Sequence, residues 1–231
     1  MNTDNWIPFY KINPEDNNLI ETNLIYTPLV SPSGNTFCMS FDYKNKYQHE
    51  DLAHWLPERP YYTKEMVKFF FDREVKYLSV FKDYSWAPRN ISIDYDEQKI
   101  FFSWSGETCN QIVYGNRNLD DECPNWKEQM FTIIKDIVDA GYYKPSLYPH
   151  CYYIDDGVLR TIDFYGCIEK EHPYIALEDI RGMIGETSGP RFEAAIVDGF
   201  LNLEVLFKGA LQSWVKWPDD VLPEFYRKLY E

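Results

Sequence analysis

The chain lacks the sequence features of several classes of protein. Its five cysteines form no CxxC pair, and its four histidines do not supply the spacing of a zinc finger. No basic run is longer than two residues, and the formal net charge is −14, which argues against a nucleic-acid-binding surface. No apolar stretch approaches the roughly 18 residues of a membrane span. The N-terminus has no basic segment followed by an apolar one, so we expect no signal peptide.

The composition that remains is typical of a folded intracellular protein. The 231 residues are 45% hydrophobic and 18% aromatic, enough for one large domain or two small lobes that share a cleft. An odd, scattered set of cysteines fits free thiols in a reducing compartment. We therefore expect a cytoplasmic protein. The many Asn, Tyr and Ile residues suggest an AT-rich, viral or phage genome, and the compartment would then be the host cytoplasm.

Hydrophobic periodicity predicts an α+β fold. The first 20 residues are polar and resemble an arm. Apolar residues at three- and four-residue spacing predict two long helices, and short β-rich runs separated by turn residues predict three strand pairs. In chain order we expect strands at 23–30 and 36–43, a helix from Thr63 to about Phe81, strands at 91–95 and 99–103, a helix from Asn125 to about Ala140, and strands at 151–154 and 158–162. Beyond Gly166 we expect helices at 177–184, 191–206 and 222–230, with a break at Gly199 as an alternative for the second of them.

The segment from Lys144 to Gly166 is the most informative part of the chain. The loop Lys-Pro-Ser-Leu-Tyr-Pro-His-Cys leads into the last strand pair, whose second strand delivers Asp163 into Phe-Tyr-Gly. A carboxylate at the end of a buried strand, followed by a glycine, is a common way to present a metal ligand at a cleft. Asp163 is therefore a candidate metal ligand. The alternative is a strand-end aspartate that bonds to loop amides.

This order of parts resembles the catalytic loop, hairpin and metal-binding loop of protein kinases. The resemblance implies a two-lobed protein-kinase-like fold, with a small β-rich N-lobe and a reduced, mainly helical C-lobe. It divides the chain into an N-terminal arm at 1–20, an N-lobe-like part at 21–108 and a reduced C-lobe at 109–231. ATP with Mg²⁺ or Mn²⁺ is the cofactor that such a fold implies, and Asp163 would hold the metal.

The resemblance also assigns two cofactor-binding candidates in the N-lobe-like part. Glu74 lies beside the apolar stripe of the first long helix, where kinases carry a glutamate that pairs with a strand lysine. If Glu74 is buried it needs a partner; the alternative is a solvated helix edge. Trp104 follows the strand that leads out of the small lobe, where it is a candidate for stacking on a base or for a place in the core.

The kinase motifs are degenerate. Leu147 and Pro149 match the catalytic loop, but Ser146 stands where the substrate-orienting aspartate belongs and Cys151 where the second metal-binding asparagine belongs. His150 is a candidate base, with a loop histidine bonded to the backbone as the favoured alternative. The strand at 36–43 contains no lysine, and the first 105 residues contain one glycine, so the glycine-rich phosphate loop is missing.

These departures point to a kinase-like pseudoenzyme. We expect a module that binds a protein partner, with a nucleotide at the interlobe cleft, and that binds neither nucleic acid nor membrane. Two alternatives stay open. One is a divergent metal-dependent phosphotransferase that uses Asp163, and the other is an aromatic-rich structural or interaction protein with no nucleotide site.

Overall fold

The computed structural model describes residues 2–8, 10–12, 19–21, 26–41, 64–105, 107–115, 117–144, 147, 149–170, 196–197 and 200–201. The helices expected at 177–184 and 222–230, and Ser146, lie outside these residues. In the part of the chain that is described, no helix is long and apolar enough to cross a membrane.

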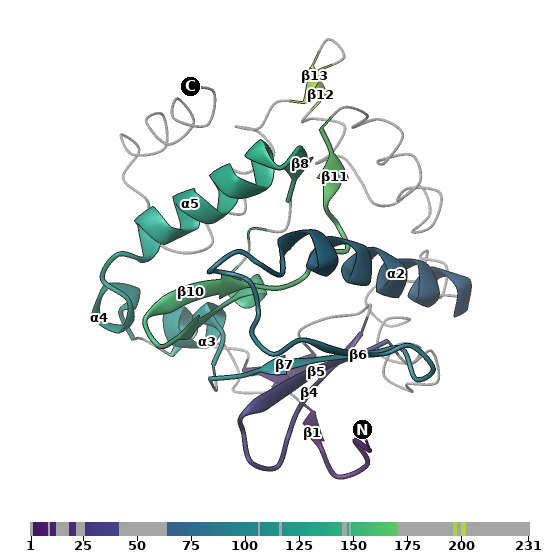
Figure 1. Ribbon diagram of the computed structural model, residues 1–231. Coiled ribbons are helices and arrows are strands. Elements are labelled where there is room, and N and C mark those ends of the chain that lie inside the picture. The colour runs from purple at the N-terminus through teal and green to yellow at the C-terminus, as the bar shows by residue number, and fades with distance from the viewer. Residues whose placement is uncertain are drawn as a thin grey trace.

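A five-stranded antiparallel sheet forms the N-terminal part of the molecule, at the bottom of Figure 1. Its order is β1-β4-β5-β7-β6, and the strands are β1 (Ile7–Pro8), β4 (Thr27–Val30), β5 (Thr36–Ser40), β6 (Ser92–Asp94) and β7 (Lys99–Ser103). The two predicted strand pairs are confirmed as β4–β5 and β6–β7. The central pair β5–β7 places Cys38 opposite Phe101. Residues of the expected arm contribute β1 to the edge of this sheet.

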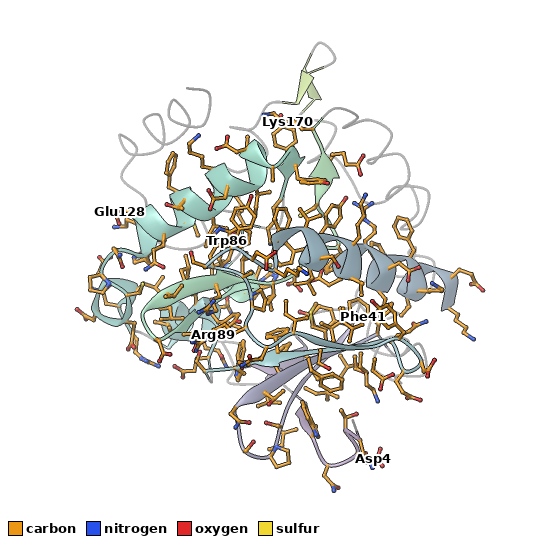
Figure 2. The ribbon with its side chains drawn as sticks, viewed as in Figure 1. Asp4, Phe41, Trp86, Arg89, Glu128 and Lys170 are labelled. Atoms are coloured by element: carbon orange, nitrogen blue, oxygen red, sulfur yellow. The ribbon has the colours of Figure 1, made fainter. Side chains whose placement is uncertain are left out.

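Helix α2 (Lys64–Phe81) lies across one face of the sheet, as Figure 1 shows. Its apolar stripe, which includes Val67, Phe70 and Leu78, is buried as the periodicity predicts. The rings of Phe71 on this helix and Phe41 at the end of β5 lie 5.6 Å apart, edge to face. Phe41 is labelled between the sheet and the helix in Figure 2. The helix and the sheet therefore share one aromatic core.

The second long helix packs against the last hairpin. They are preceded by α3 (Cys109–Tyr114) and α4 (Leu119–Glu122), and consist of α5 (Trp126–Asp139), β9 (Tyr152–Asp155) and β10 (Val158–Thr161). The helix predicted from Asn125 to about Ala140 and the strand pair predicted at 151–154 and 158–162 are confirmed to within a residue or two. Gly141 ends α5 with φ 92°, a left-handed conformation that glycine adopts readily.

Trp86 joins the two parts of the molecule. It follows α2 in the chain, and its indole Nε1–H donates a hydrogen bond of 2.8 Å to Asp136 of α5. It is labelled between the two helices in Figure 2. The ring also packs 5.5 Å from Phe81.

The helix expected at 191–206 is wrong where the structure describes it. Ile196–Val197 (β12) and Phe200–Leu201 (β13) pair as antiparallel strands instead. Asp198 and Gly199 stand between them in the sequence. An Asp-Gly pair favours a two-residue hairpin turn, which explains why strands form there. Two further short pairs are β2 (Tyr10–Ile12) with β3 (Leu19–Glu21), and β8 (Tyr142–Tyr143) with β11 (Ile168–Glu169).

Candidate functional site

Glu74 and Asp163 are buried together between α2 and the segment that follows β10. Glu74 is 0% exposed and Asp163 is 1% exposed. The backbone N–H of Tyr165 donates a hydrogen bond of 2.6 Å to Glu74 Oε2. The burial of Glu74 excludes the solvated helix edge that the sequence left open. The glutamate instead fastens α2 to the loop after Asp163.

Arg73 adds a second attachment from the same turn of α2. Its Nε donates to the carbonyl of Tyr165 at 2.7 Å, and its Nη2 donates to the carbonyl of Cys167. The ring of Tyr165 meets Phe70 of α2 edge to face at 5.5 Å. Arg73 and Glu74, neighbours on α2, therefore bind the same loop, Arg73 as hydrogen-bond donor and Glu74 as acceptor.

Asp163 adopts φ 65°, in the left-handed region that non-glycine residues rarely occupy. Its Oδ1 accepts a hydrogen bond of 2.7 Å from the hydroxyl of Tyr26, which precedes β4. Phe164, the next residue, is fully buried and lies 5.3 Å from the ring of Phe81. The loop is thus held from the sheet by Tyr26 and from α2 by Phe81.

Lys144 is the cation of this cluster, and sequence reasoning did not assign it a role. Its side chain is 2% exposed, and its Nζ lies 5.4 Å from the centre of the Tyr152 ring and 5.8 Å from that of Phe164. Its charge acts to lower the pKa of Glu74. A lysine buried this deeply is rare unless it is paired. Lys144 therefore places a buried positive charge close enough to Glu74 to act on it.

Burial nevertheless has the largest effect on the pKa of Glu74. Loss of hydration and the neighbouring charge of Asp163 raise the pKa of Glu74 to about 8, against the opposing effects of the Tyr165 hydrogen bond and Lys144. With this pKa, Glu74 is mainly in its acid form at neutral pH.

His150 and Cys151 meet Asp163 from the loop before β9. Both belong to the short 3₁₀ turn η2 (Pro149–Cys151). A ligand atom of each side chain and an oxygen of Asp163 all lie within 4.8 Å of one another. Burial is the main reason that the pKa of Cys151 lies well above its usual value, and Asp163 raises it further. His150 is half-buried, whereas Cys151 is buried.

Trp104 is part of the hydrophobic core. It is 5% exposed, and its ring centre lies 4.7 Å from Phe37 and 4.8 Å from Tyr153. Its ring faces are packed by protein side chains, so we do not assign it a base-stacking role. The structure therefore brings Glu74, Asp163, His150 and Cys151 together and places Trp104 in the hydrophobic core.

Replacement of Tyr26 by phenylalanine tests the link between the sheet and Asp163. We expect the free energy of unfolding to fall by roughly 1.5–3 kcal/mol, because a buried hydrogen bond to a charged group is lost. Tyr95→Phe is the matched control, because Tyr95 is 66% exposed and its replacement should change stability by less than about 0.5 kcal/mol. Urea denaturation of both variants measures the difference. Equal stabilities would show that the Tyr26 hydroxyl contributes nothing.

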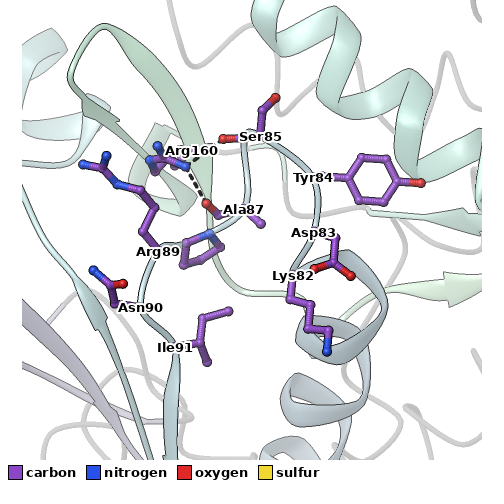
Figure 3. A pocket seen from close by; sticks show the side chains of 10 residues that line it. Lys82, Asp83, Tyr84, Ser85, Ala87, Arg89, Asn90, Ile91 and Arg160 are labelled. Atoms are coloured by element: carbon purple, nitrogen blue, oxygen red, sulfur yellow. Dashed lines mark hydrogen bonds between the residues drawn. The ribbon is translucent and has the colours of Figure 1, made fainter.

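A separate open pocket of about 520 Å³ lies around residues 82–91 and Arg160 (Figure 3). Its two arginines already have partners. Arg160 donates to the carbonyls of Ser85 and Ala87 at 2.8 and 2.6 Å and to Asp155 at 2.7 Å. Arg89 forms an ion pair with Asp155 at 2.7 Å. These bonds tie β10 to the segment after α2, so we assign the arginines a structural role.

Comparison with known proteins identifies similar folds only among solved structures. No protein-family model matches the chain, and no curated protein matches it. The bifunctional kinase-methyltransferase WbdD matches over 96% of this chain and 46% of its own, with 12% identity and a TM-score of 0.46. A second WbdD structure matches over 96% and 45%, with 12% identity and a TM-score of 0.44.

The Rio2 kinase of Chaetomium thermophilum, in an ADP/Mg²⁺-phosphoaspartate complex, matches over 89% of this chain and 67% of its own. Its identity is 10% and its TM-score 0.41. The chain spans less than half the length of WbdD. Both of these similar proteins are named as kinases. Because these TM-scores are below 0.5, we take the function from the residues of the chain and not from these proteins.

Proposed function

We propose that this chain is a kinase-like pseudoenzyme, a two-lobed protein that acts as a protein-interaction or regulatory module and does not transfer phosphate efficiently. The observation that carries this proposal is the state of Asp163. Its carboxylate is buried and accepts a hydrogen bond from Tyr26. One oxygen of the carboxylate that would hold magnesium in a kinase thus binds Tyr26 and connects the sheet to the loop after β10.

The residues beside Asp163 do not suit Mg²⁺–ATP, the cofactor that a kinase-like fold implies. Mg²⁺ prefers a near-octahedral shell of oxygen ligands. Of the residues at this cluster that the kinase resemblance assigns to the metal, Asp163 is the one that offers an oxygen ligand. Cys151, at the position of the second metal-binding residue, offers a thiol. Ser146 has no carboxylate with which to accept a substrate proton. We therefore assign no phosphate-transfer step to these residues.

The charge of the chain suits a role in protein binding. A net charge of −14 favours association with a partner that has a basic surface, and it accelerates their encounter at low salt. The attachment of α2 to the loop by Arg73 and Glu74 offers a way to couple the interlobe cleft to the surface of the protein. From composition alone we also infer a cytoplasmic protein with neither a membrane nor a nucleic acid as partner.

One observation favours a second candidate function, a divergent metal-dependent phosphotransferase. Lys144 places a buried positive charge near Glu74, where the charge of the missing strand lysine would act. In such an enzyme Asp163 would leave Tyr26 and hold the metal of a nucleotide. The two candidates differ in whether nucleotide binding requires both a metal and Asp163.

A thermal-shift titration separates them. ATP and other nucleotides are added with and without Mg²⁺ or Mn²⁺ to wild type, Asp163→Asn and Tyr95→Phe. A bound nucleotide at about 100 times its Kd stabilises a protein by about 2.7 kcal/mol, which is several degrees for a chain of this size. We expect no metal-dependent shift in any of the three proteins. A metal-dependent shift that disappears only in Asp163→Asn would favour the phosphotransferase and contradict the pseudoenzyme.

A further inference from the structure

Three side chains of different ligand types meet where a kinase-like fold would bind magnesium. A ring nitrogen of His150, the Sγ of Cys151 and a carboxylate oxygen of Asp163 all lie within 4.8 Å of one another. A tetrahedral ion with bonds of roughly 2.0–2.3 Å keeps its ligand atoms about 3.5 Å apart. Small side-chain rotations, which shorten the separations by about an ångström, would therefore bring the three atoms onto one ion.

The chemistry of this set selects the kind of ion. A thiolate and an imidazole favour borderline and soft ions, and they are poor ligands for hard ions such as Mg²⁺ and Ca²⁺. One sulfur, one nitrogen and one carboxylate oxygen are all ligands of Zn²⁺, which takes four of them in a tetrahedron. The substitution of Cys151 for an asparagine, with His150 beside it, thus changes the metal preference of the site.

We propose that His150, Cys151 and Asp163 form a three-ligand site for a borderline divalent cation of the Zn²⁺ class. The fourth position of the tetrahedron is left for water or an external ligand. This site needs no nucleotide and is independent of whether the chain acts as a pseudoenzyme.

The neighbours of the three ligands are arranged to support them. The Tyr26 hydroxyl donates a hydrogen bond to Oδ1 of Asp163, which orients the carboxylate. The carbonyl of Cys151 accepts hydrogen bonds from the N–H of Ile162 at 2.9 Å and from the hydroxyl of Thr161 at 3.1 Å. The backbone of the cysteine is therefore fixed to the strand that leads to Asp163.

Access and proton balance are also consistent with such a site. His150 is half-buried and so has contact with solvent, whereas Cys151 and Asp163 are buried. When Zn²⁺ binds, the Cys151 S–H bond breaks, the electron pair stays on sulfur as the Zn–S bond forms, and the proton passes to water. Binding therefore weakens at lower pH.

Zinc titration of untagged protein, stripped with a chelator, tests the site directly. A chromophoric chelator competes for the ion, and Mg²⁺ is titrated in parallel. We expect one Zn²⁺ per chain in wild type and an affinity at least roughly tenfold lower in His150→Ala. Cys38→Ser is the matched control, because Cys38 is a buried cysteine of β5, and it should bind zinc as wild type does.

Co²⁺ identifies the sulfur ligand. Wild type loaded with Co²⁺ should show a thiolate-to-cobalt charge-transfer band in the near ultraviolet, and Cys151→Ser should lose it while Cys38→Ser keeps it. Should Cys151→Ser fail to fold, which circular dichroism would show, His150→Ala still decides the matter because its side chain is half-buried at the surface. Wild type that binds no zinc, or zinc that binds as tightly to His150→Ala as to wild type, would overturn the proposal.

Discussion

Replacement of Lys144 by methionine is expected to lower the free energy of unfolding by about 3–5 kcal/mol, the loss expected when buried acidic groups lose a nearby buried positive charge. The methionine keeps most of the packing against Tyr152 and Phe164, so the loss reports the charge. Two buried carboxyl groups, those of Glu74 and Asp163, then remain without a cation in a site of low polarity. Urea denaturation at neutral pH measures the change.

Lys135→Met is the matched control for this variant. Lys135 pairs with Asp139 on α5 at 3.1 Å, and both side chains are exposed, so its replacement should change stability by less than about 1 kcal/mol. The double variant Lys144→Met with Asp163→Asn should recover part of the loss, because a carboxylate is removed together with its cation. A Lys144→Met protein as stable as Lys135→Met would show that the cluster does not depend on this charge.

The stability of the protein is expected to fall as the pH rises from about 5 to about 8, because of Glu74. Burial and Asp163 raise the pKa of Glu74 to about 8 from an ordinary value of 4.5. Between these two values the folded protein holds a proton that the unfolded chain has released. Each pH unit in this window therefore removes up to about 1.4 kcal/mol of stability, and the contribution is fully present only below the lower value.

The variant Glu74→Gln isolates this contribution. Glutamine keeps a carbonyl that can accept the Tyr165 N–H and has no proton to lose. Its stability curve between pH 5 and pH 8 should therefore be flatter than that of wild type. Glu128→Gln, at an exposed position of α5 labelled in Figure 2, should keep the wild-type slope. If the stability of wild type and of Glu74→Gln changed with pH in parallel, the raised pKa of Glu74 would be contradicted.

Local patterns in the sequence predicted most of the fold. Helices α2 and α5 and the three strand pairs were predicted because each has an apolar period or a turn signal within a dozen or so residues. The helix expected at 191–206 failed because apolar spacing was given more weight than the Asp-Gly pair. A short apolar run cannot distinguish a strand from a helix by periodicity alone.

The candidate site was predicted in part. Asp163 was singled out by its place at the end of an apolar strand, and Glu74 by the resemblance to kinases together with its place beside the apolar stripe of α2. The contribution of Tyr26 was missed, because it is 137 positions from Asp163 in the sequence and their contact depends on how the sheet meets the loop. The burial of Lys144 was missed for the same reason. Contacts of this kind come from tertiary packing, and no local pattern records them.

The most direct test of the pseudoenzyme is a measurement of phosphate release and self-phosphorylation from radiolabelled ATP. Wild type and Asp163→Asn are compared in Mg²⁺ and in Mn²⁺, with Tyr26→Phe included because it frees the carboxylate of Asp163. We expect the rates of wild type and Asp163→Asn to be equal and no greater than that of buffer with ATP. A metal-dependent turnover in wild type that Asp163→Asn abolishes would contradict this account and establish a phosphotransferase.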